Sequence, residues 1–220
     1  MNRALQLLVL ALLTGLACAP LRAAESPVPW RLSDPRLTAA PKTARPLRAT
    51  PNVAEREREA RVTEITRLLR ERPDDLTLRK ELAALRLQDG RDDEAARIWY
   101  EVARIDGTDR EALSGLASCM LRAGSHDAAA RLLEEMRERG IAGPSDRLNL
   151  AYGYFAGGRF EPAGVTLRAV EEEERAKAEP DETILENARY NLAVVAYSLD
   201  RPEEAEAWLE KVRGEDESTP

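Results

Sequence analysis

The chain has 220 residues, of which 33% are charged and only 5% aromatic, and its formal net charge is -7. Rich in Ala, Leu, Arg and Glu, this composition is typical of exposed helices and favours an all-α fold. An acidic protein repels nucleic acid and anionic membranes, so we expect a protein or peptide partner and no nucleic acid.

The first 24 residues have the pattern of a secretory signal. A single positive charge precedes an apolar stretch over residues 4–19, which is shorter than the roughly 20 residues of a membrane-spanning helix. Residues 15–18 resemble the end of a bacterial lipoprotein signal, in which Cys18 would carry the lipid, whereas residues 17–19 also fit ordinary export. We therefore predict a signal peptide over 1–24, with Cys18 as a candidate lipidation site. The protein is expected to be exported, either to the periplasm or as a membrane-anchored lipoprotein.

Residues 25–52 form a basic, proline-rich segment. Its six prolines interrupt any helix, and its five Arg and Lys residues against two Asp and Glu residues give a net charge of about +3. Such a segment favours extended backbone, which at about 3.1 Å per residue reaches roughly 80 Å. We predict a disordered linker that holds the folded part away from a membrane. At the other end, residues 214–220 are predicted to be an acidic, disordered tail.

Residues 53–74 predict a single charged helix that ends near Pro73. We expect this helix to cap the hairpins that follow it, because the first hairpin of a stacked array otherwise exposes its apolar face.

A helix-turn-helix pattern then recurs four times. Leu-Ala pairs lie 34, 34 and 42 residues apart, and a second alanine follows each Leu after 13 residues. The Leu-Ala pair predicts the inner face of a first helix, the turn residue its end at positive φ, and the second alanine a close crossing of the second helix. Neither helix buries its apolar stripe alone, so we expect the hairpins to stack. The pairs are Leu82-Ala83, Leu116-Ala117, Leu150-Ala151 and Leu192-Ala193, followed by Ala95, Ala129, Ala163 and Ala205, with Gly90, Gly124, Gly158 and Asp200 in the turns.

This pattern resembles the tetratricopeptide repeat, and residues 187–212 match the family's idealised repeat without a gap. The resemblance implies an all-α superhelix, a solenoid of about four repeats, behind the N-terminal capping helix. Eight extra residues within 171–183 are expected to lengthen the second helix of the third repeat by about two turns, with their glutamates on a solvated face. The array is predicted over 75–213, with repeats near 75–108, 109–142, 143–184 and 185–213.

The resemblance also implies a binding surface. In this family the first helices line a concave groove, and the positions two before, two after and five after the Leu are the most exposed to it. In the third and fourth repeats these positions collect large aromatic residues, which are typical of peptide-binding surfaces. The alternative is that some of these rings pack within or between repeats. The predicted groove residues are Lys80, Leu87, Ser118, Leu121, Arg122, Leu148, Tyr152, Phe155, Tyr190, Val194 and Tyr197.

The residue types that catalysis needs are scarce. His126 is the only histidine, and the sequence has neither a glycine-rich phosphate loop nor a CxxC pair. Cys119 lies beside Met120 in a predicted helix, which favours a buried packing residue over a nucleophile. We therefore expect a protein that is not an enzyme and that carries no cofactor and no metal.

These observations predict a non-catalytic protein-protein interaction scaffold of the bacterial cell envelope, with a peptide or protein partner in the groove. The chain is similar to tetratricopeptide lipoproteins that help assemble pili or secretion machinery; this resemblance implies a role of that kind, and export, the linker and the groove support it. The alternative is a self-associating module, a homo-oligomer, that uses the apolar face of the last hairpin with Trp208 and Leu209. Membrane contact is expected only through an N-terminal lipid.

Overall fold

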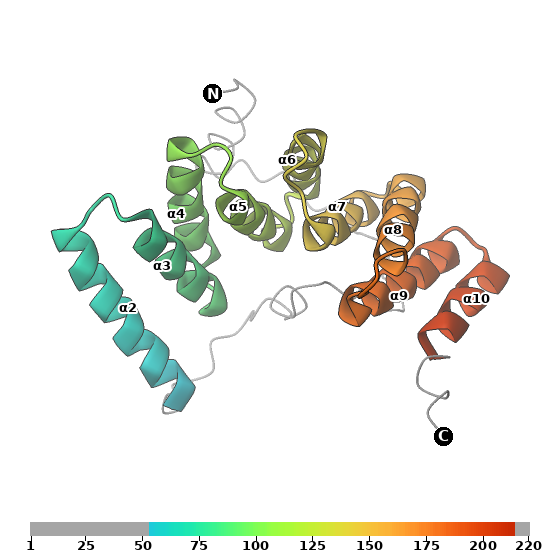
Figure 1. Ribbon diagram of the computed structural model, residues 1–220, viewed down its shortest axis with the longest axis horizontal. Helices are drawn as coiled ribbons and strands as arrows, with labels where there is room; N and C mark the ends of the chain where they lie inside the picture. Colours follow the sequence, from blue (N-terminus) through green and yellow to red (C-terminus); the bar gives the residue numbers. More distant parts are fainter. Residues whose placement is uncertain (1–52, 214–220) are drawn as a thin grey trace. The chain divides into compact units, whose positions relative to one another are not determined.

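The computed structural model describes residues 53–213, and its secondary structure in this range is helical (Figure 1). The predicted signal peptide with Cys18, the linker and the tail lie outside the described residues. The chain divides into two compact units, whose described parts are residues 53–124, the N-terminal unit, and residues 125–213, the C-terminal unit. The helices are α2 (Val53–Glu71), α3 (Leu76–Gln88), α4 (Asp92–Ile105), α5 (Arg110–Arg122), α6 (His126–Glu138), α7 (Pro144–Ala156), α8 (Phe160–Arg175), α9 (Glu182–Ser198) and α10 (Pro202–Arg213).

Short polar signals fix where the helices begin and end. Aspartates precede three of the first helices, and the side chain of Asp75, for example, accepts a hydrogen bond from the Leu78 N–H at 3.1 Å. The four predicted turn residues all have positive φ, between 72° and 76° at the glycines and 58° at Asp200. The predicted alternation of helix and turn is therefore confirmed at each hairpin.

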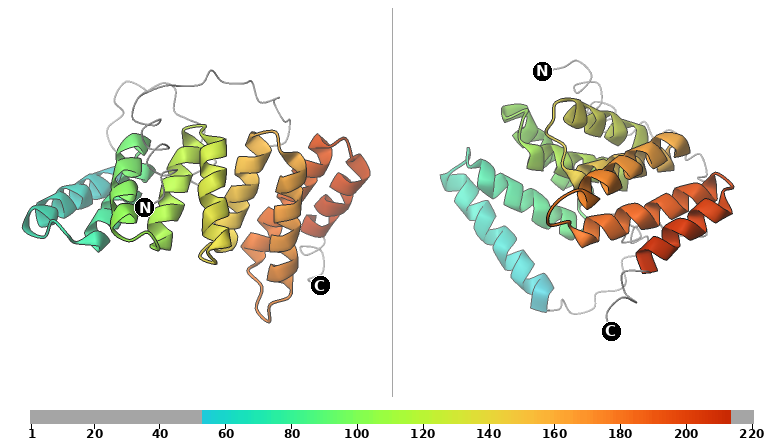
Figure 2. Two further views of the ribbon diagram at one scale, coloured as in Figure 1. Left: turned by 90° about the horizontal axis from the view of Figure 1, so that it is seen from above. Right: turned by 45° about the vertical axis from the view of Figure 1, so that its right-hand side comes forward.

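In the N-terminal unit, α3 and α4 form a hairpin, α5 packs on α4, and α2 lies against α3 (Figure 2). Val62 and Ile65 face inward from α2, and ion pairs join Arg58 to Asp89 and Arg61 to Glu81. The predicted capping helix is thus present.

Small residues let the helices of this unit approach closely. Ala83 and Ala95 are fully buried, and the Trp99 ring lies on the backbone of Gly115, where an added Cβ would come within 2.4 Å of the indole. Leu82, in contrast with the other repeat leucines, is only half-buried, because the single helix that precedes its hairpin packs on α3 less closely than a full hairpin does. Glycine at position 115 is therefore a packing requirement.

In the C-terminal unit, helices α6 to α10 lie side by side, and each packs on the next (Figure 2). Leu150, Leu167, Val170 and Leu192 are almost completely buried, as the repeated apolar pattern predicts. This unit also buries an ion pair, since Arg189 Nε lies 3.2 Å from Glu171 Oε1 and both side chains are less than a tenth exposed.

The prediction for residues 171–183 is partly wrong. Helix α8 ends at Arg175, well before Pro180, and the extra residues are shared between a slightly longer α8, a loop over 176–181 and an earlier start of α9. Glu174 is buried rather than solvated, and its Oε1 accepts the Asp181 N–H at 2.9 Å while Lys177 Nζ pairs with Oε2. These bonds reverse the chain and so prevent a protruding acidic rod.

Candidate binding surface

The predicted cationic groove residues of the N-terminal unit are neutralised within the unit. Lys80 Nζ lies 3.0 Å from Asp109 Oδ2 and 2.9 Å from Glu111 Oε2, and the hydrogen bonds to Glu111 and Asp109 raise the pKa of Lys80. Arg122 donates from Nε to Asp92 at 2.9 Å. Both cations therefore tie helices together before any partner is present.

Five predicted groove residues are buried, and this part of the groove prediction is corrected. Adjacent first helices touch one another, α3 against α5 and α7 against α9, and the side chains between them are enclosed. Ser118, for example, donates its hydroxyl hydrogen to the Ser114 carbonyl at 2.9 Å. In this conformation these residues stabilise the fold rather than contact a partner. They are Leu87, Ser118, Leu121, Leu148 and Val194.

Two of the predicted aromatic residues pack against rings of neighbouring helices. Phe155 meets Phe160 across the α7–α8 turn, with ring centroids 5.3 Å apart. The half-buried Tyr152 ring forms a T-shaped pair with the His126 ring, with centroids 5.7 Å apart, and burial raises the pKa of Tyr152. Packing within the unit therefore accounts for Phe155 and for part of Tyr152.

Tyr197 is the most accessible aromatic residue of the predicted groove, and Tyr190 lies on the same helix. They lie seven residues apart on α9, so they share one face of that helix. Tyr197 is 52% exposed and Tyr190 is half-buried, with the buried Val194 between them. We call this pair the α9 tyrosines; they offer two rigid rings on a helix that packing holds in place.

Sequence reasoning missed a polar cluster between α6 and the α7–α8 turn. The Tyr154 hydroxyl donates to Glu134 Oε1 at 2.5 Å, and the Arg159 guanidinium lies 4.5 Å from the centre of the Tyr154 ring. Burial, which is the main cause, and the hydrogen bond to Glu134, which is the second, raise the pKa of Tyr154 to about 12. The sequence shows Tyr154 within the first helix of the third repeat, but its partner Glu134 lies on another helix, which the repeat pattern does not indicate.

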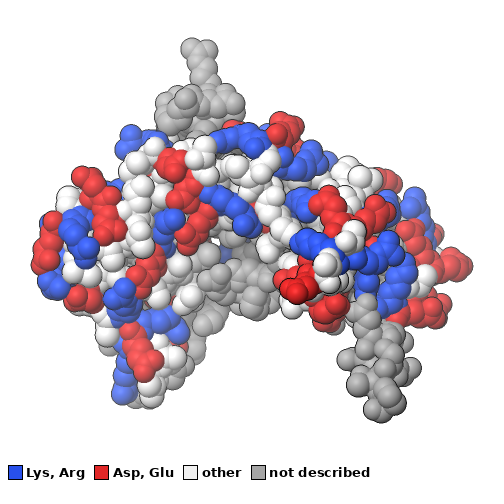
Figure 3. Space-filling model, in the orientation of Figure 1, with Lys and Arg blue, Asp and Glu red and all other residues white. Residues whose placement is uncertain are grey.

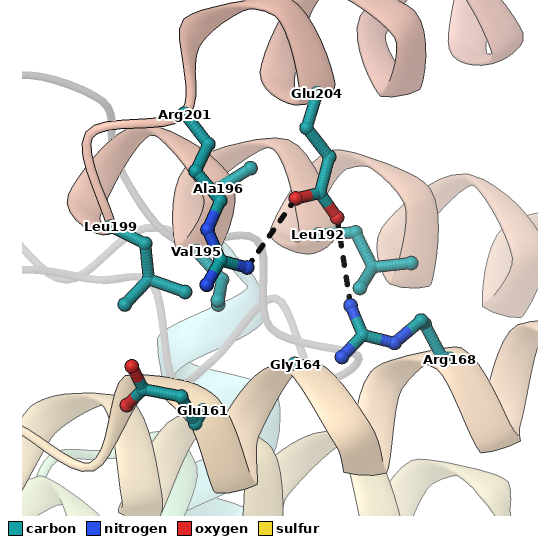
Figure 4. Close-up of a pocket in the computed structure, with 9 residues that line it drawn as sticks. All are labelled: Glu161, Gly164, Arg168, Leu192, Val195, Ala196, Leu199, Arg201 and Glu204. Carbon is teal, nitrogen blue, oxygen red and sulfur yellow. Dashed lines mark ion pairs between the residues drawn. The ribbon is translucent and has the colours of Figure 1, made fainter.

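A small surface pocket lies where α8, α9 and α10 meet (Figure 4). Leu192, Val195 and Leu199 of the α9 segment provide apolar lining. Glu204 lies 3.6 Å from both Arg168 and Arg201, so the two cations at the pocket share one carboxylate. These two ion pairs therefore link α8 and the α9–α10 turn to α10.

The side chains most used in catalysis are engaged in packing. Burial raises the pKa of the Cys119 thiol to about 12, which suppresses the nucleophilic thiolate at neutral pH. Burial also lowers the pKa of His126, and its Nδ1 atom is enclosed. Among residues 53–213 there is no group of three or more His, Cys, Asp or Glu side chains placed to hold a metal ion.

Charges of both signs are interspersed over the face drawn in Figure 3. Within the described part of the chain, no helix combines the length and the apolar character that a membrane span requires.

Antiparallel helix pairs with alanine crossings and positive-φ turns define an all-α helical-repeat protein. More particularly, the chain contains tetratricopeptide repeats: one family model of that description matches residues 62–110, and another matches 110–135 and 187–211. Repeats of this kind generally mediate protein-protein interactions.

Solved structures share the fold. A crystal structure of MamA aligns with a TM-score of 0.62 at 14% identity, over 77% of this chain and 97% of that one. MamA from Desulfovibrio magneticus RS-1 gives 0.64 at 12% identity, over 74% and 88%. A thermophilic tetratricopeptide-repeat protein of Thermus thermophilus gives 0.56 at 18% identity, over 72% and 83%. No curated protein sequence matches the chain.

Proposed function

We propose that this chain is a non-catalytic scaffold of the bacterial cell envelope that binds a peptide or protein through the first helices of its C-terminal unit. The observation that carries the proposal is the exposure of Tyr197 with Tyr190 beside it on one face of α9. Exposed rings on a rigid helix bind with little loss of side-chain entropy, which is why tyrosine is enriched among residues that dominate binding energy.

The envelope assignment rests on the sequence. A secretory signal over 1–24, with Cys18 as the lipidation site, followed by a proline-rich linker, would place the repeats at a membrane surface facing the periplasm. A tethered scaffold of that kind suits the assembly of pili or secretion machinery. Growth with labelled palmitate tests the anchor: Cys18→Ser should abolish incorporation, whereas equal labelling of both proteins would exclude a lipid at this residue.

A cross-linking experiment tests the binding surface. The full chain is cross-linked in envelope fractions, purified, and compared with a Tyr190→Ala/Tyr197→Ala variant of equal thermal stability. The matched control is Val165→Ala, because Val165 is 61% exposed on α8, outside the first helices. We expect the tyrosine variant to lose partners that the control retains. Identical partner sets for all three proteins would refute binding through the α9 tyrosines.

A further inference from the structure

The second helices of all four repeats carry the same apolar spacing, but the last one is packed differently. In α4, α6 and α8, the alanine and the large residue four positions later are at most 3% exposed, and the apolar residue three further on is fully buried. The corresponding residues of α10 are Ala205, Leu209 and Val212. Ala205 is 7% exposed, whereas Leu209 and Val212 are half-buried.

Helix α9 covers only the inner side of this apolar surface. Trp208 and Leu209 pack against a cluster formed by Ala193, Ala196 and Ala205. Nothing among residues 125–213 covers the side of α10 that a following helix would occupy. We call the surface formed by Trp208, Leu209 and Val212 the α10 stripe.

The preceding junction shows what shape fits such a surface. There, α9 packs against both α7 and α8, and it approaches Gly164 so closely that an added Cβ would lie 3.3 Å from Val195 Cγ1. The α9–α10 hairpin repeats the α7–α8 hairpin, so the complementary object is again a helix with an aliphatic face. Glu206 stands where α8 has Gly164, so this helix would lie further from α10 and would meet a carboxylate.

The charges beside the α10 stripe indicate the charge of the helix that would bind there. Glu203, Glu206 and Glu210 are exposed and spaced by three and four residues, which aligns them along one side of α10. Acidic side chains also appear at the edge of the molecule that carries α10 in Figure 3. Lys211, whose ammonium lies over the Trp208 ring at 3.8 Å from the centroid, supplies one positive charge against these three carboxylates, so this side of α10 stays net acidic. A helix with basic flanks is therefore favoured.

A second copy of the chain fits less well. Two α10 stripes facing each other across a twofold axis would bring the same glutamates together. Head-to-tail contact would place α2 on the stripe, and α2 presents charged side chains such as Arg67, which pairs with Glu64 and Glu71.

We propose that the α10 stripe docks an amphipathic helix with basic flanks from a different protein. This interaction is separate from binding at the α9 tyrosines, because it uses the outer face of the last hairpin.

Two synthetic peptides based on residues 182–198 provide the probes. The basic peptide carries E182K, T183K, E186K and Y197K, and the acidic peptide carries T183E and Y197E, so both keep the buried face of α9. Fluorescence anisotropy of each labelled peptide is measured against the full chain over a range of salt concentrations. We expect the basic peptide to bind about tenfold more tightly than the acidic one at low salt, with the difference shrinking as salt rises.

Variants of the full chain locate the site. The Glu206→Gln/Glu210→Gln variant leaves the apolar packing intact and should lower the affinity for the basic peptide about three- to tenfold. Glu172→Gln/Glu179→Gln, a matched pair of exposed residues elsewhere in the same unit, should leave it unchanged. Leu209→Lys should abolish binding in protein that circular dichroism shows to be folded.

Three results would overturn the proposal. Equal affinity for the two peptides would exclude the basic flank, and unchanged affinity in both the glutamine and the Leu209 variants would exclude the stripe. Sedimentation that shows a dimer of the full chain, dispersed by Leu209→Lys, would identify a second copy as the occupant. Loss of binding at the α9 tyrosines would affect none of these readouts.

Discussion

The two units use the same hairpin but bury different groups. In the described part of the N-terminal unit, Ser118 is the one buried polar side chain, and the interior is otherwise apolar around Trp99 and Leu116. The C-terminal unit encloses several polar and charged groups, namely Asp146, Asn149, Thr166, Glu171, Glu174, Arg189 and Asn191. One unit therefore depends on close apolar packing, and the other depends also on pairing its buried polar groups.

The two units also differ in the side chains that their first helices present at the surface. The N-terminal unit places ion-paired cations, Lys80 and Arg122, on its first helices, whereas the C-terminal unit leaves Tyr190 and Tyr197 accessible. Repeats of one pattern can thus differ in how they are held together and in what they offer to a partner. Four substitutions test this difference.

The largest effect is expected from Arg189→Met. The change removes the Arg189 guanidinium and leaves the Glu171 carboxylate buried, with the mostly exposed Arg175, 3.8 Å away, as its remaining ion-pair partner. We therefore expect the C-terminal unit to lose about 3–5 kcal/mol of stability. Hydrogen exchange should accelerate in α8 and α9 but not in α3 to α5. Adding Glu171→Leu should restore much of the protection, and Arg67→Met, at an exposed pair, should have little effect.

Gly115→Ala tests the apolar interior of the N-terminal unit. The new methyl group would lie 2.4 Å from the Trp99 ring, so the ring must move, and we expect a loss of about 1–3 kcal/mol in denaturant unfolding. Gly153→Ala in the C-terminal unit is the matched control, because its Cβ meets Ala130 Cβ at 3.3 Å and needs only a small adjustment. Equal losses for the two variants would contradict the special role of Trp99.

A smaller, pH-dependent effect is expected at His126, the only histidine of the chain. Burial lowers the pKa of its imidazole in the folded state, partly opposed by Asp127, so the unfolded chain binds more protons below about pH 6.5. Stability should therefore be full above that pH and should fall as the pH drops below it towards the lowered folded-state pKa. The midpoint of thermal unfolding should lose this dependence in His126→Gln. An NMR titration of the folded protein at or above the ordinary histidine pKa would disprove the assignment.

The smallest effect is expected from Asp200→Gly. Asp200 is the one non-glycine residue with positive φ among residues 53–213, at 58°, where glycine occupies the equivalent turns. Glycine should relieve the backbone strain and stabilise the C-terminal unit by up to about 1 kcal/mol, measured by thermal unfolding. Gly90→Ala, in the matching turn of the N-terminal unit, should produce a loss of similar size.

Much of the fold could be predicted because its determinants are local. The spacing of Leu150, Ala151 and Ala163 fixes which faces of one hairpin meet, and Gly158 fixes its turn. The end of α8 was not predictable in this way. It depends on the bond from the Asp181 N–H to the buried Glu174, which forms only when the loop has already reversed.

The binding surface was harder to predict than the fold. The repeat spacing in the sequence places Leu148, Val194 and Tyr197 on the expected faces of α7 and α9. The exposure of these side chains, however, depends on how closely neighbouring first helices approach each other. That distance is set by packing between hairpins, which a single hairpin pattern does not contain. The periodic pattern therefore found the α9 tyrosines but also included side chains that packing encloses.

The position of Trp99 has a practical consequence for spectroscopy. Its indole is only 3% exposed in the N-terminal unit, whereas Trp208 lies half-buried under a lysine ammonium in the C-terminal unit. An enclosed indole emits at shorter wavelength than a hydrated one, and a nearby cation changes its emission further. In a Trp30→Phe background, single-tryptophan proteins would therefore give each unit an intrinsic optical reporter, so that the melting of either unit can be followed separately without an added dye.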